Sequence, residues 1–211
     1  MMITRGRDLN LAVPFGIAAL VFIWSAYHPH DYFTWFLEIF PAVIGGAVLL
    51  ATRKTFPLTP LVYVLIACHM IVLMIGGHYT YAEVPLFNWL RDTLVLSRNH
   101  YDRVGHFMQG FVPALITREI LLRKTPLRPG KLMFFIVVCV CLAISAAYEL
   151  LEWLVAELTG TAATAFLGTQ GDVWDTQWDM FFALVGSITA QIALGRLHDR
   201  ELLQLSSSHK G

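Results

Sequence analysis

Six long apolar segments alternate with polar stretches along the chain. Each is close to the length of about 20 residues that an α-helix needs to cross a bilayer. The pattern predicts an all-α fold, a polytopic membrane bundle of six transmembrane helices that forms a single domain over 1–211. The segments cover roughly 11–27, 33–51, 58–77, 104–122, 132–155 and 177–195.

The stretch between the third and fourth segments differs from the other polar stretches. Over 78–102, apolar and charged residues are mixed at an amphipathic spacing. This spacing predicts a short helix that lies in the membrane interface.

Composition points to the same class of protein. The chain is 56% hydrophobic and only 14% charged, whereas a soluble domain carries about 25% charged residues. The net charge is zero, which offers no general attraction to nucleic acid. We therefore expect membrane lipid, and no nucleic acid, as a partner. The oligomeric state is not indicated.

The distribution of basic residues predicts the orientation. Of the 15 lysines and arginines, all but Arg91, Arg98 and Arg103 lie in the alternating set of loops that includes both termini. By the positive-inside rule both termini are cytoplasmic. The first segment follows Arg5 and Arg7 as in a signal peptide, but it is long for one and lacks a small-residue cleavage site. We expect it to be retained.

This topology brings separated polar residues to one depth, the outer edge of the bilayer. Ionisable residues in membrane-spanning segments are costly and mark functional sites by default. The residues concerned are Glu38, His78, Asp102, His106, Glu149, Glu152, Asp175 and Asp179.

The fourth segment opens with the densest motif. Asp102, His106 and Gln109 are spaced i, i+4 and i+7, so they share one helix face. A histidine oriented by a carboxylate can serve as a general base or as a metal ligand. The alternative is a buried Asp–His hydrogen bond that only holds the bundle together.

Two further acidic groups accompany this motif. Glu149 and Glu152 are i, i+3 neighbours, and two carboxylates this close in a low dielectric require a shared proton or a cation. Alternatively, Glu152 reaches water and Glu149 pairs with Arg103 or another cation. Asp172, Asp175 and Asp179 form an acidic stripe if they are helical, although the preceding glycines also allow a loop that folds Asp172 over the stripe.

Together these groups form an oxygen-rich set with imidazole, which suits a divalent metal such as Zn²⁺, Mn²⁺, Fe²⁺ or Mg²⁺. The sequence contains no H-E-x-x-H or G-x-S-x-G motif, so the metal prediction rests on convergence. The candidate metal ligands are His78, His100, His106, Glu149, Asp172 and Asp175. The candidate catalytic residues are Asp102, His106, Glu149, Glu152, Asp175 and Asp179.

Four blocks of the sequence resemble the bacterial inner-membrane family typified by YjdF. They are 77–81, 98–106, 148–153 and 167–177, and the likeness extends over essentially the whole chain. The resemblance implies a multi-pass membrane protein and implies no particular activity.

A more distant likeness is to VanZ-type membrane proteins, which are linked to teicoplanin resistance. Their Asp-Lys-x-x-His element, later Glu and Asp-x-x-x-Asn helix would correspond here to Asp102 and His106, to Glu149, and to Asp175 and Asp179. Arg103 replaces the lysine and Asp179 the asparagine. The likeness implies one polar site formed by the last three helices.

Three functions fit these patterns. The first is a membrane-embedded enzyme, metal-dependent, that acts on a lipid or lipid-linked substrate at the outer leaflet. The second is a proton-coupled transporter, because membrane carboxylates and histidines also form proton relays. The third is a structural membrane subunit whose polar cluster only stabilises helix packing.

Overall fold

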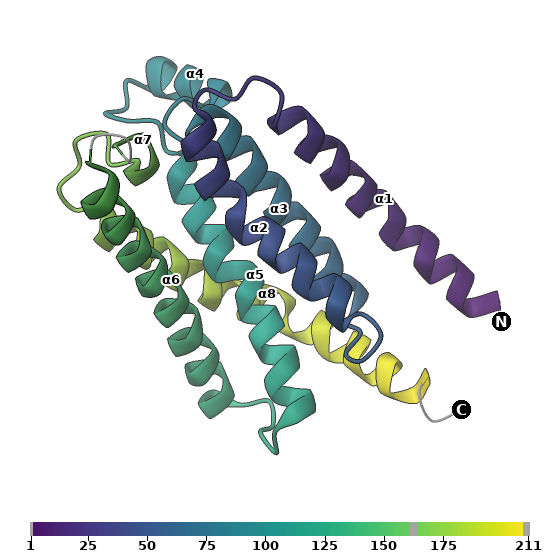
Figure 1. The fold of residues 1–211 in the computed structure, drawn as a ribbon. Helices are drawn as coiled ribbons and strands as arrows, with labels where there is room; N and C mark the ends of the chain where they lie inside the picture. The colour runs from purple at the N-terminus through teal and green to yellow at the C-terminus, as the bar shows by residue number, and fades with distance from the viewer. Residues whose placement is uncertain (1, 161–163, 209–211) are drawn as a thin grey trace.

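A computed structural model describes the backbone of residues 2–160 and 164–208, and the side chains of 11–160 and 165–207. Arg5, Arg7 and Lys210, which count toward the predicted cytoplasmic charge, lie outside the described side chains. Every element of the described chain is a helix (Figure 1). The helices are α1 (Met2–Ser25), α2 (Tyr32–Thr52), α3 (Pro60–Tyr79), α4 (Pro85–Leu94), α5 (Tyr101–Lys124), α6 (Lys131–Thr159), α7 (Thr164–Leu167) and α8 (Asp175–Ser208).

The all-helical membrane fold expected from the sequence is confirmed, and four helices are long and apolar enough to cross a bilayer. These are α2, α3, α6 and α8. The apolar part of α1, Leu11–Ser25, is shorter. The polar residues of α5 keep it outside this group, and it packs between α3, α6 and α8. A helix with this many neighbours can carry polar groups that lipid would not tolerate.

The helix connections gather at two ends of the bundle. Figure 1 shows both termini at one end, together with the α2–α3 and α5–α6 connections. At the other end lie α4, α7 and the start of α8. The short helix predicted within 78–102 is present as α4.

Close packing of α5 on α8 fixes how the two helices are aligned. A Cβ atom at Gly110 would collide with the carbonyl of Ala183, and one at Gly186 with the carbonyl of Phe107. Small residues of this kind let two backbones approach each other in a membrane bundle. The contact lies just below the charged starts of both helices and so brings those starts together.

A buried polar network joins α3, α5 and α8 near the end that holds the termini. Glu119 is fully buried and accepts hydrogen bonds from Thr59, from His198 Nε2 at 3.1 Å and from Arg123 at 2.6 Å. Arg118 donates to His198 Nδ1 at 3.1 Å. Because these donors are all paired, the network holds the start of α3 against α5 and α8.

Candidate polar site

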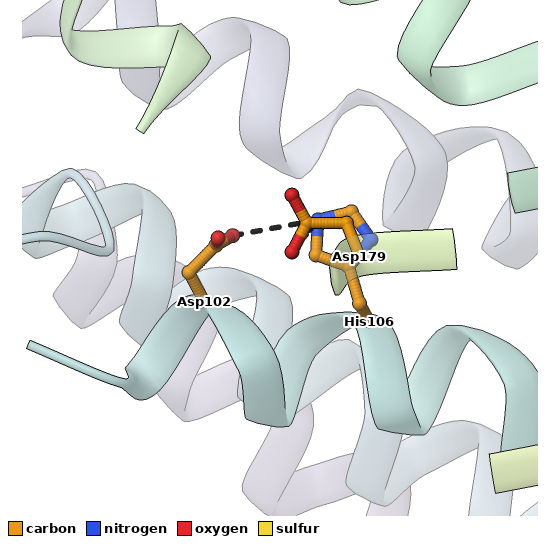
Figure 2. Close-up of side chains that lie close together, drawn as sticks. All are labelled: Asp102, His106 and Asp179. Carbon is orange, nitrogen blue, oxygen red and sulfur yellow. Dashed lines mark ion pairs between the residues drawn. The ribbon is translucent and has the colours of Figure 1, made fainter. Parts of the chain in front are cut away.

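His106 lies at the centre of a buried polar cluster. Its Nδ1 donates to Gln109 Oε1 at 2.8 Å, and its Nε2 lies 3.4 Å from Asp102 Oδ1 and 3.8 Å from Asp179 Oδ1. Asp102 and His106 come from α5 and Asp179 from α8, and Figure 2 shows the three side chains converging. Because α5 begins at Tyr101, Asp102 is helical and shares a face with His106.

Two arginines neutralise part of the acidic stripe. Arg103 contacts Asp172 at 3.1 Å, Asp175 at 2.9 Å and Asp179 at 2.6 Å. Arg98 binds Asp175 and lies 3.4 Å from Asp102. The alternative in which Arg103 pairs with Glu149 is thus not the arrangement present. The cluster still holds more carboxylates than cations.

The loop before α8 is locked onto the start of α5. Asn99 and Gln170 exchange two hydrogen bonds of 2.9 Å, from the Asn99 backbone N–H to Gln170 Oε1 and from Gln170 Nε2 to the Asn99 carbonyl. Arg98 also donates to the Gly168 carbonyl at 3.0 Å. Gly168 and Gly171 have φ of +61° and +84°, a region that glycine adopts readily. This turn places Asp172 over the two guanidinium groups.

Glu149 and Glu152 approach the other side of the His106 ring from α6. Glu149 Oε1 lies 3.7 Å from His106 Nδ1 and has no hydrogen-bond partner among the described residues. Glu149 as a whole is only 8% exposed. A buried carboxylate oxygen without a donor is costly, so this atom is a clear candidate for contact with a cation or a substrate.

Two sets of side chains have ligand atoms close enough to share one metal ion. The first is Asp102, His106 and Asp179, and the second is His106, Glu149 and Glu152. All five residues are buried. Because Gln109 occupies Nδ1 of His106, Nε2 is left facing the first set.

Four of the predicted metal ligands take other positions. His78 donates from Nδ1 to the Ser25 carbonyl at 3.0 Å and stacks near Trp24, so it ties α3 to α1. His100 precedes α5 outside both ligand sets, and its pKa is lowered by partial burial and then by the nearby arginine charges. Asp172 and Asp175 face the guanidinium groups of Arg98 and Arg103.

Two other polar residues line the same region: Glu38, which the sequence places at the same depth, and His69, which was not among the predicted site residues. Glu38 of α2 is buried and His69 of α3 is half-buried, both within apolar helices, and the buried His69 Nε2 atom has no hydrogen-bond partner among the described residues. An isolated polar residue in an apolar span is the sequence signal that identifies both. Arg98, which the sequence places in a loop, also belongs to the site, because it pairs with Asp175.

A cavity of about 570 Å³ extends from this cluster along the bundle. Its polar end is lined by Asp102, His106 and Glu152 on one side and by Glu38 and His69 on the other. The rest is mostly apolar, with Thr52 and Lys124 at the far end, and is bounded by α2, α3, α5 and α6. The polar cluster is therefore the end wall of a long apolar groove.

Comparison with known proteins indicates a membrane protein. No solved structure matches the chain. The inner membrane protein YjdF of Escherichia coli (strain K12) is 53% identical over 183 residues, which cover 87% of this chain and 88% of that protein. Residues 11–200 match the model of a family described as predicted membrane protein (DUF2238). The chain therefore belongs to the DUF2238 family of membrane proteins.

Proposed function

We propose that this protein is a membrane-embedded enzyme that binds a divalent cation at Asp102, His106 and Asp179 and acts on a lipid or lipid-linked substrate. The observation that supports this most strongly is the position of the His106 ring. It is buried between carboxylates from α5, α6 and α8. Its Nε2 faces two of those carboxylates within reach of a single ion.

In this proposal the chain crosses the inner membrane six times, with α1 and α5 as the two further spans and both termini in the cytoplasm. The asymmetry of free positive charge supports this orientation. At the end near α4, Arg98 and Arg103 are buried and paired with aspartates. At the other end Arg53, Lys54 and Lys124 are among several cations in the connections. The polar site then lies at the outer edge of the bilayer.

The charge balance of the cluster favours a bound cation. Two guanidinium groups face Asp102, Asp172, Asp175 and Asp179, and the glutamate pair of Glu149 and Glu152 makes no ion pair with an arginine in the described chain. Burial of uncompensated carboxylates is costly. One imidazole nitrogen with several carboxylate oxygens is a ligand set that suits Zn²⁺, Mn²⁺ or Mg²⁺.

The residues around His106 have separable roles. Gln109 Oε1 accepts a hydrogen bond from Nδ1 and so holds the ring with Nε2 toward the carboxylates, as the outer partners of metal-bound histidines commonly do. Glu149 and Glu152 lie on the opposite side, where one of them can take a proton from a reacting group. A bound divalent cation supplies an activated water and polarises a phosphoryl or carbonyl oxygen.

Metal content tests this proposal. We expect about one divalent ion per chain in protein purified without chelator, measured by elemental analysis. His106→Ala should lose the ion while it remains folded in detergent. His100→Ala is the matched control, because His100 belongs to neither ligand set, and should keep it. Metal-free wild-type protein that is otherwise folded would contradict the proposal and favour a purely structural cluster.

A proton-coupled carrier is a second candidate, because the cavity continues from the cluster past the middle of α5. The part of that cavity farther from the cluster is apolar except at its end, where Thr52 and Lys124 line it. This lining gives little support for a proton path. Acidification inside proteoliposomes under a pH gradient, lost in Glu152→Gln, would favour the carrier over the enzyme.

A further inference from the structure

We propose that the groove between α2 and α6 binds the hydrocarbon chain of a phospholipid from the outer leaflet, with the lipid phosphate at the His106 cluster. The proposal deepens the proposed function, because it names the substrate class of the same site. It rests on that function for the cation that would hold the phosphate.

The groove is lined by one face of each bordering helix. On α2 the lining positions include Glu38, Gly45 and Val48, and on α5 they include His106, Val112 and Ile116. From His106 to Lys124 helix α5 rises about 27 Å at about 1.5 Å per residue. That length is comparable with the hydrocarbon thickness of a bilayer, about 30 Å. A lipid chain of one leaflet spans about half of that thickness, so with its polar end at the cluster it would occupy the part of the groove from His106 to about Ile116.

The way the helices pack leaves the groove facing the lipid. Helix α2 packs on α3 and α7, whereas α6 packs on α5, α7 and α8. The groove therefore has α3 and α5 as its floor and α2 and α6 as its two sides. A Cβ atom added at Gly45 would meet nothing within 4 Å. The space in front of Gly45 is therefore free.

The polar end has two facing walls of different origin. Asp102, His106 and Glu152 come from α5 and α6, and Glu38 and His69 from α2 and α3. His69 Nε2 is buried and has no hydrogen-bond partner among the described residues, and His69 lines the groove. A head group that enters between the walls therefore meets an unsatisfied polar atom on the α3 side and the carboxylates of Asp102 and Glu152 on the other. Because the cluster holds more carboxylates than cationic side chains, it would repel an anionic phosphate. The bound cation is therefore needed between the phosphate and the carboxylates.

Photolabelling in a membrane tests the proposal. The full-length protein is reconstituted in vesicles of phosphatidylethanolamine and phosphatidylglycerol. A trace of phosphatidylethanolamine that carries a diazirine midway along its acyl chain is included. After illumination, mass spectrometry compares labelling of Ile116 in the groove with that of Ile192, which is 72% exposed on α8. We expect several-fold more label on Ile116.

Two glycine variants separate a bound lipid from bulk lipid. Gly45→Phe should fill the groove and reduce the Ile116 label to the Ile192 level. Gly16→Phe is the matched control, since Gly16 is an exposed position on α1 with equally open space, and it should leave the label unchanged. If Gly45→Phe does not fold, Val48→Trp obstructs the groove one turn further along.

Equal labelling of Ile116 and Ile192 in the wild type would overturn the proposal, and so would enrichment that persists in a folded Gly45→Phe protein. The metal content of the wild-type protein distinguishes this failure from failure of the proposed function. Wild-type protein that binds the cation but labels Ile116 and Ile192 equally would retain the enzyme proposal and lose the lipid-chain site. Gly45→Phe lies away from Asp102, His106 and Asp179 and should leave the cation bound.

Discussion

Replacement of Arg103 by glutamine is the sharpest perturbation of the cluster. The guanidinium is buried and lies within 2.6–3.1 Å of oxygens from Asp172, Asp175 and Asp179. Removing one partner of a buried ion pair costs about 3–5 kcal/mol, because the remaining charge is uncompensated. Three carboxylates share this guanidinium, so we expect Arg103→Gln to fall at the upper end of that range.

The assay is unfolding of the purified protein in detergent, followed by circular dichroism. Arg91→Gln is the matched control, because Arg91 forms an exposed pair with Asp92, and such pairs contribute about 0–1 kcal/mol. Arg103→Gln combined with Asp179→Asn should be less destabilising than the sum of the two single changes, by about 0.5–3 kcal/mol. A loss below about 1 kcal/mol for Arg103→Gln, with additive effects in the double variant, would refute the reasoning.

Three further predictions concern parts of the fold outside the cluster. Gly110→Leu should separate α5 from α8, because any Cβ there meets the Ala183 carbonyl, and loss of a compact peak on size exclusion in detergent would report it. Glu119→Leu should destabilise the protein by about 3–5 kcal/mol, because it leaves several buried donors unpaired; thermal unfolding measures this. Asp31→Ala should cost about 1 kcal/mol as a lost N-cap. Because the Thr34 backbone N–H lowers the pKa of Asp31, this stabilisation should be present above the ordinary pKa and disappear as pH falls through the folded value. Equal effects of the change at neutral and strongly acidic pH would contradict it.

The helices were largely predictable, because apolar length and amphipathic spacing depend on local sequence. The predicted segment 104–122 lies within α5, Tyr101–Lys124, which starts earlier because the Asn99 side chain accepts the Tyr101 N–H. The predicted segment 177–195 lies within α8, which runs on to Ser208. The charges beyond residue 195 end the apolar pattern without ending the helix.

The residues of the polar cluster were less predictable. Whether a side chain joins the cluster depends on the rotation of its helix as well as on its depth in the membrane. His69 and His78 are both on α3, nine residues apart in sequence, which is about two and a half turns, so they point to opposite sides. The expected depth in the membrane favoured His78 as a site residue, yet it is His69 that lines the cavity with His106. The pairing of Arg98 and Arg103 with the aspartates depends on the docking of α8, which no local pattern encodes.

Manganese binding tests the central claim most directly. Electron paramagnetic resonance of Mn²⁺-loaded protein counts bound ions, and spin-echo modulation detects a directly bound histidine nitrogen. We predict one Mn²⁺ per chain with one nitrogen ligand, lost in Asp179→Asn and retained in Asp92→Asn, whose aspartate is exposed and paired with Arg91. Protein that is folded but binds no Mn²⁺, or binds it without nitrogen modulation, would contradict a cation site at His106.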